Sequence, residues 1–131
     1  MSMSTLIRNK IMINFIHFHD LRKALEWYTE VLGIGVRVNG IEHGFLELEM
    51  DGTDLTLLQA VDPNLTRSSY SVFTFESDNV LQAREDLVAK GVEVREIEDF
   101  GEIIGCNFRD CEGNVLMVCG PKPEGYVRES K

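Results

Sequence analysis

The first half of the chain pairs a short apolar run with a segment of helical periodicity. Residues 11–18 (IMINFIHF) are apolar, β-branched and aromatic, which is typical of a buried strand. Asp20 follows as a candidate helix N-cap, and Gly33 is expected to end the helix in a left-handed conformation. Between them, apolar residues recur at the spacing of one helix face: Leu21, Ala24, Leu25, Tyr28, Val31 and Leu32. The pattern then predicts strands at residues 35–38, 45–50 and 55–59, with the turn DGTD between the last two.

The second half of the chain repeats this order of elements. The helix is capped by Asp78 or Asn79 and ends at Lys90-Gly91, with an apolar stripe of Val80, Ala83, Leu87 and Val88. Strands are predicted at residues 70–76, 92–96, 103–109 and 115–119, with the turn DCEGN between the last two. The separation of Asp20 from Gly33 equals that of Asp78 from Gly91. The chain is therefore predicted to contain two βαβββ modules.

The repeat predicts an α+β fold in which two tandem βαβββ modules form a cupped mixed sheet with the helices on the convex side. Each helix covers one face of its sheet, so the two bare faces can curl into a shared cup, a shape that binds small ligands. We expect one domain over residues 1–131, with these parts: module one at about 11–60, a polar linker at 61–69, module two at about 70–120 and a C-terminal tail at 121–131. Open sheet edges favour a homodimer. The pattern leaves open whether each cup forms within one chain or across two.

Composition and charge exclude several classes of partner. The chain has 131 residues, 44% of them hydrophobic, which suits one compact domain with a real core. Its net charge of −9 and the lack of a Lys/Arg cluster argue against nucleic-acid binding. No apolar stretch approaches the ~20 residues of a membrane span. The N-terminal residues lack the apolar core of a signal peptide, so we expect a cytoplasmic protein with no membrane partner.

The cysteines give no sign of a structural cross-link or a zinc site. Cys106, Cys111 and Cys119 are odd in number and form no CxxC pair. We therefore expect three reduced thiols.

Three stretches of the duplicated pattern together resemble one protein family. They are HDLRKALEWYTEVLGIGV on the first helix, FTFESDNVLQAREDLVAKGVEV on the second strand and helix, and FRDCEGNVLMV on the final hairpin. In this order they resemble the glyoxalase/bleomycin resistance protein/dioxygenase superfamily, also called vicinal oxygen chelate proteins, over about residues 11–120. The chain departs from the usual pattern at Cys111, where Pro is common. The resemblance implies paired βαβββ modules, a cup and usually a dimer, but the family's chemistries range from lyases and dioxygenases to metal-free drug-binding proteins.

The resemblance also implies where a metal would be held, and at least three of the four positions hold no suitable ligand in this chain. Family enzymes bind a divalent metal with His, Gln and Glu side chains. The first ligand would stand seven residues before Asp20, at Ile13, and the last seven residues after Asp110, at Met117. The counterpart of Ile13 in module two is Val72, or Ser71 by the repeat offset. Aliphatic side chains have no lone pair, and a thioether suits soft ions such as Cu(I).

The fourth ligand position lies on the strand at residues 55–59, and its register stays open. Thr56 and Leu57 both fit, and Gln59 is the only plausible metal ligand there. A relocated site is an alternative, because His17 and His19 share a strand face with Ile13. Carboxylates that could complete it are Glu47, Glu49 and Glu76. The simpler interpretation is that His17 lines the cup and His19 is exposed.

We therefore predict a metal-independent small-molecule-binding protein with no cofactor and no assigned catalytic residue. The ligand would lie in an apolar cup lined by Ile13, Phe15, His17, Val72, Thr74, Glu76, Val115 and Met117. His17 and Glu76 would orient the ligand, and an acidic lining would favour a cationic one. The apolar floor is equally compatible with simple core packing. Two alternatives stay open: a metal-dependent glyoxalase-type lyase or ring-cleaving dioxygenase with relocated ligands, and a dimeric protein-interaction module.

Overall fold

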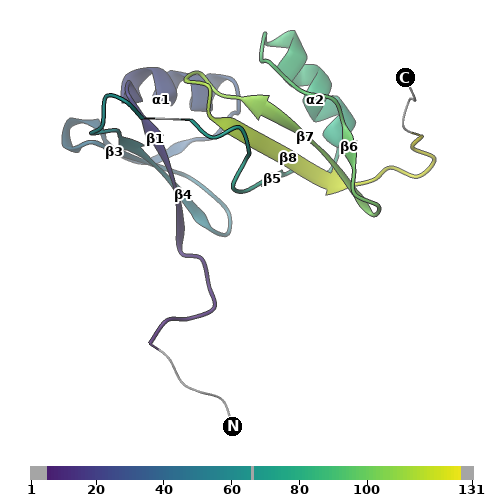
Figure 1. Cartoon of the computed structure of the whole chain (residues 1–131), viewed down its shortest axis with the longest axis horizontal. Coiled ribbons are helices and arrows are strands. Elements are labelled where there is room, and N and C mark those ends of the chain that lie inside the picture. Colours follow the sequence, from purple (N-terminus) through teal and green to yellow (C-terminus); the bar gives the residue numbers. More distant parts are fainter. Residues whose placement is uncertain (1–5, 66, 128–131) are drawn as a thin grey trace. The chain divides into compact units, whose positions relative to one another are not determined.

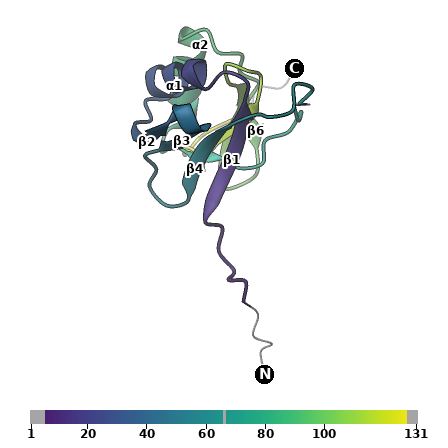
Figure 2. The ribbon, with the colours of Figure 1, turned by 90° about the vertical axis from the view of Figure 1, so that its left-hand side faces the viewer.

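The computed structural model describes residues 6–65 and 67–127, and these residues divide into two units between Val61 and Asp62. Each unit is one βαβββ module (Figures 1 and 2). The predicted α+β fold of two tandem modules, each with one helix and one mixed four-stranded sheet, is confirmed. Thr66 of the predicted linker and residues 128–131 of the predicted tail lie outside the described residues.

Module one holds one helix and four strands in the order β1-β4-β3-β2. Its elements are β1 (Ile13–Phe18), α1 (Leu21–Glu30), β2 (Val36–Gly40), the short 3₁₀ helix η1 (Ile41–His43), β3 (Phe45–Leu48) and β4 (Asp54–Gln59). Strand β1 runs parallel to β4, and the other neighbours are antiparallel. The parallel pair requires a crossover, which α1 provides.

Module two repeats this arrangement with the strand order β5-β8-β7-β6. Its elements are β5 (Phe75–Glu76), α2 (Val80–Ala89), β6 (Glu98–Asp99), β7 (Ile103–Arg109) and β8 (Val115–Pro121). Strand β5 is parallel to β8, as β1 is to β4. The two modules therefore share one topology, as the sequence repeat predicted.

The helix ends follow the predicted chemistry. The Asp20 carboxylate accepts hydrogen bonds from the backbone N–H groups of Arg22 and Lys23, both at 3.1 Å. Asn79, rather than Asp78, caps α2 by accepting from the N–H of Gln82 at 3.1 Å. Gly33 and Gly91 both adopt the left-handed conformation after their helices, with φ of 71° and 82°. Such caps satisfy backbone groups that a helix end leaves without partners.

Each core lies between a helix and one face of its sheet. In module one, Phe18 on β1 meets Tyr28 on α1 edge to face, with ring centroids 5.7 Å apart. The buried apolar residues of module one are Ile16, Phe18, Leu21, Ala24, Tyr28, Leu46, Leu48, Leu55 and Leu57. Those of module two are Val80, Leu87, Ile104, Cys106, Phe108, Val115, Leu116 and Val118. The prediction that Val88 belongs to the buried stripe of α2 is wrong, because Val88 is 51% exposed.

Two predicted strands of module two are shorter or displaced. Of residues 70–76 only Phe75 and Glu76 pair with β8, so Tyr70–Thr74 precede the strand. The strand expected at 92–96 is instead β6, at Glu98–Asp99, with an isolated bridge from Val94 to Phe108. Between the bridge and the first β6 pair, the chain advances four residues from Val94 to Glu98, whereas the partner strand spans only three, from Phe108 to Gly105. One extra residue thus forms a bulge that interrupts the ladder.

Neither described helix meets the length and apolarity that a bilayer span requires. The expected cytoplasmic location stays a prediction.

Candidate functional site

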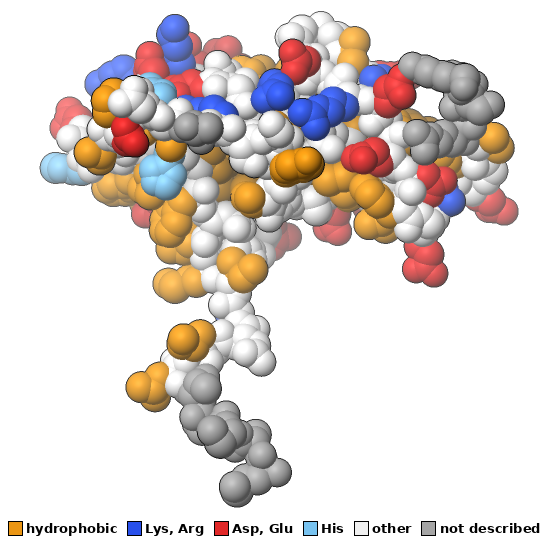
Figure 3. Space-filling model, viewed as in Figure 1, with side chains coloured by type: hydrophobic (Ala, Val, Ile, Leu, Met, Phe, Trp, Pro, Cys, Tyr) orange, Lys and Arg blue, Asp and Glu red, His pale blue; other side chains and the backbone are white. Residues whose placement is uncertain are grey.

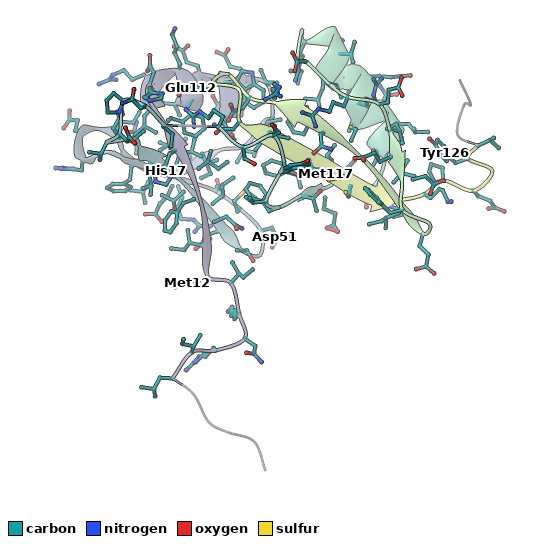
Figure 4. The ribbon with its side chains drawn as sticks, viewed as in Figure 1. Met12, His17, Asp51, Glu112, Met117 and Tyr126 are labelled. Carbon is teal, nitrogen blue, oxygen red and sulfur yellow. The ribbon has the colours of Figure 1, made fainter. Side chains whose placement is uncertain are left out.

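The sheet face of module one that points away from α1 is here called the module-one open face. Strand alternation places on it Ile13, Phe15, His17, Val38, Phe45, Glu47, Thr56 and Leu58, because their neighbours Ile16, Phe18, Leu46 and Leu57 are buried under α1. Figure 3 shows hydrophobic side chains gathered over the strands of this module, and Figure 4 shows His17 on β1. The sequence-predicted residues Ile13, Phe15 and His17 thus share one face.

The strand register arranges this face in two rows. The first row crosses the sheet as Phe15, Thr56, Glu47 and Val38. The second row crosses it as His17, Leu58, Phe45 and Gly40. Phe15 is 52% exposed and Val38 is 40% exposed. Each row therefore combines apolar surface with polar side chains that can donate or accept a hydrogen bond: Thr56 and Glu47 in the first row, and His17 in the second. This is the make-up of many small-molecule sites.

Gly40 gives the Phe45 ring its position on this face. A Cβ atom on Gly40 would overlap the Phe45 ring, and the two residues are direct partners across β2 and β3. The outer part of the ring therefore covers the glycine on this face. A flat aromatic surface offers a ligand both apolar area and a face for stacking.

The corresponding face of module two, which points away from α2, is here called the module-two open face. Its central row runs Glu76, Cys119, Gly105 and Glu98 across β5, β8, β7 and β6. Met117 and Asn107 form the next row, and the Asn107 amide donates to the Glu98 carboxylate at 3.0 Å. Figure 4 shows Met117 on β8. This face is more polar than its counterpart in module one.

The remaining predicted lining residues of module two are less uniform. Val115 shares strand parity with Met117 but is only 7% exposed. Val72 and Thr74 lie ahead of β5 rather than in a strand, and Val72 is 82% exposed. The Thr74 hydroxyl donates to the carbonyl of Phe75 at 3.0 Å. The strand that was expected to aim Val72 and Thr74 is therefore absent at their positions.

The residues at the family's metal positions do not fit a divalent metal. Ile13 and Met117 lie on the open faces and offer an aliphatic group and a thioether. Of the two β4 positions left open, Thr56 lies on the module-one open face, because it pairs with Phe15, and Leu57 lies on the other face. Gln59 has the opposite parity, and its amide donates to the carbonyls of His19 at 2.9 Å and Ala60 at 3.5 Å. Gln59, the one plausible metal ligand of this strand, therefore does not lie on the module-one open face.

The relocated metal site of His17, His19 and nearby carboxylates also finds no counterpart. Within residues 6–65 and 67–127, no group of three or more His, Cys, Asp and Glu side chains is placed to hold a metal ion.

One polar network was missed by sequence reasoning. The Arg67 guanidinium donates to Asn114 Oδ1 at 2.8 Å and pairs with Glu112 Oε1 at 2.6 Å. Asp110, in the same turn, accepts from the N–H groups of Glu112 and Asn114 at 3.0 and 2.9 Å. The segment assigned to the linker is therefore anchored to the last hairpin. Its polar composition gave no sign of this, since the partners lie 45 and 47 residues further along the chain.

Comparisons with known proteins agree with this fold. The family model described as Glyoxalase/Bleomycin resistance protein/Dioxygenase superfamily matches residues 15–118. No curated protein matches the sequence. The structure is similar to a lactoylglutathione lyase from Agrobacterium tumefaciens, with a TM-score of 0.70, 20% identity and coverage of 91% of this chain and 98% of that one.

Two further solved structures show the same fold. TnmS3, an antibiotic binding protein from Streptomyces sp. CB03234, gives a TM-score of 0.71 at 21% identity, covering 91% of this chain and 100% of its own. A glyoxalase/bleomycin resistance protein/dioxygenase from Nocardioides gives 0.69 at 22% identity, covering 97% and 93%. At these identities the likeness establishes the fold, and the activity has to be argued from the site.

Proposed function

Because the chain belongs to the glyoxalase/bleomycin resistance protein/dioxygenase superfamily, we propose that it binds a small molecule without the help of a divalent metal. One observation carries the proposal: apolar side chains stand where a family enzyme needs metal ligands. Ile13, Val72 and Met117 stand at three of those positions. A metal-assisted reaction needs convergent N or O ligands, and these side chains supply none.

The ligand body would pack on the aromatic surface of the module-one open face. Phe15 and Phe45 offer large apolar area, and Leu58 lies between His17 and Phe45 in the second row. Burying such side chains contributes about 25 cal/mol per Å² of apolar surface removed from water. Burial of the half-exposed Phe15 side chain under a ligand would therefore stabilise the complex.

Polar groups on the same face would orient the ligand. The half-buried Glu47 lies in one row with Thr56 and Phe15, so a carboxylate borders the aromatic surface. His17 occupies the next row of this face. With a net charge of −9, this arrangement favours a cationic or hydrogen-bond-donating ligand with an apolar body. The expected homodimer stays part of this proposal.

Replacing Phe15 with serine is expected to weaken binding of an apolar probe by about tenfold or more, since tenfold corresponds to about 1.4 kcal/mol of lost contact. The probe is Nile red, a neutral dye whose fluorescence rises in apolar surroundings. Phe15 is 52% exposed, so the variant should fold normally.

Phe100 provides a matched control, because it is 53% exposed and follows β6 in module two, so it is no part of the module-one open face. Phe100→Ser should bind the dye as the unmodified protein does. If both variants weaken dye binding equally, or if neither weakens it, the module-one open face is not part of the ligand site.

A further inference from the structure

Two sulfur-bearing side chains lie together on the module-two open face. Cys119 is the direct partner of Gly105 across β7 and β8, and Met117 lies two residues earlier on the same face. A Cβ atom built on Gly105 would lie 2.5 Å from Cys119 Sγ and 3.0 Å from Met117 Cε. The end of the Met117 side chain thus reaches along β8 toward the Cys119 thiol, over a residue that has no side chain of its own.

A carboxylate borders this pair from the next strand. Glu76 on β5 is the parallel partner of Cys119, so both side chains leave the same face in one row. Glu76 is exposed, while Cys119 and Met117 are each half-buried. The Cys119 thiol therefore has the end of the Met117 side chain beside it on its own strand and a carboxylate on the neighbouring strand. These two side chains of β8 fill the space above Gly105.

We propose that Cys119, Met117 and Glu76 form a binding site for a soft monovalent cation, Cu(I). Thiolate and thioether ligands select Cu(I), whereas hard ions such as Mg²⁺ prefer oxygen ligands. Cys119 would bind as the thiolate, release its proton and balance the positive charge of Cu(I). Met117 would donate a sulfur lone pair, and Glu76 would offer a carboxylate oxygen at the border of the site. The site uses module two alone and goes beyond the small-molecule proposal.

The two other cysteines do not share this environment. Cys111 is exposed in the turn between β7 and β8. Cys106 is buried on the α2 side of β7, and this burial raises the pKa of its thiol to about 11. Cys106 stays protonated at neutral pH and is a poor ligand there, because metals bind the thiolate. Cys106 and Cys111 therefore serve as internal controls for a site that depends on Cys119.

The test is an anaerobic titration of the full chain, freed of metals, with Cu(I) in competition with the coloured chelator bicinchoninate. The unmodified protein should remove Cu(I) from the chelator, and its affinity should rise with pH because binding releases a proton. Cys119→Ser should weaken binding by about 100-fold and Met117→Leu by about tenfold, since each removes one soft ligand. Cys111→Ser should leave the affinity unchanged.

Met117→Leu keeps the side chain's volume, so its result stands even if Cys119→Ser folds poorly. Phe15→Ser should bind Cu(I) normally, which separates this site from the small-molecule proposal. The inference is overturned if the unmodified protein does not compete with the chelator, if Cys119→Ser folds and binds Cu(I) unchanged, or if Cys111→Ser causes the same loss.

Discussion

Replacing Gly120 with alanine is expected to lower the free energy of unfolding by about 3 kcal/mol or more. Gly120 is buried on β8, where the chain passes under the start of α2. A Cβ atom there would overlap the carbonyl oxygen of Ser77 and lie 3.1 Å from Val80 Cγ2. The Ser77 N–H also donates to the Cys119 carbonyl at 2.9 Å, so the two backbones cannot separate without losing this bond.

Gly35→Ala is the matched control for that substitution. A Cβ on Gly35 meets only the flexible Glu49 side chain, at 3.2 Å from Oε2, and Gly35 does not have a positive φ. Its effect should stay within about 0.5 kcal/mol. Urea unfolding of both variants, followed by circular dichroism, measures the difference. Similar stability of the two variants would contradict the close approach of β8 to the backbone of Ser77.

Asp110→Ala is expected to cost about 3 kcal/mol, because hydrogen bonds to a charged group contribute about 1.5–3 kcal/mol and their loss leaves donors unsatisfied. Asp110 is 7% exposed at the end of β7. Its Oδ1 accepts from the N–H groups of Glu112 and Asn114, and its Oδ2 accepts from the Asn114 amide at 2.9 Å. The oxygen of the Asn114 side-chain amide accepts a hydrogen bond from the Arg67 guanidinium. Removing the carboxylate therefore disturbs both the turn and the anchored linker.

Asp110→Asn should be milder than Asp110→Ala, since an amide oxygen still accepts from both backbone N–H groups. Asp51 is the control, because it is an exposed aspartate in the turn between β3 and β4 of module one. Asp51→Ala should change the free energy of unfolding by about 0.5 kcal/mol or less. An equal loss for Asp51→Ala and Asp110→Ala in urea unfolding would show that the network does not stabilise the fold.

The sequence predicted those elements that are set by local chemistry. Asp20 and Asn79 cap helices because their side chains satisfy nearby backbone groups, and β7 was placed at its observed bounds, Ile103–Arg109, by its run of strand-forming residues. The sequence repeat supported the predictions of the helix caps and of β7, because the second module repeats the spacing of the first.

Elements that depend on a distant partner were harder to predict. Strand β6 lies later in the chain than predicted, beyond a bulge in its pairing with β7. Residues 70–74 do not pair with β8 and therefore do not form a strand. The open register of β4 was resolved by the pairing of Thr56 with Phe15, which no local pattern contains. Arg67 meets partners on a hairpin late in the chain. In each case the deciding contact joins residues that are far apart in the chain, so the residues next to each position do not predict it.

The most direct test of metal-independent ligand binding is a Nile red titration of the unmodified protein before and after removal of metals with EDTA. We predict that the dissociation constant changes by no more than about twofold, and that adding back Zn²⁺, Ni²⁺ or Mn²⁺ does not tighten it, because the open faces bind through apolar contacts. Binding that is lost with EDTA and restored by one of these divalent ions would contradict the proposal and favour a metal-dependent enzyme of the same superfamily.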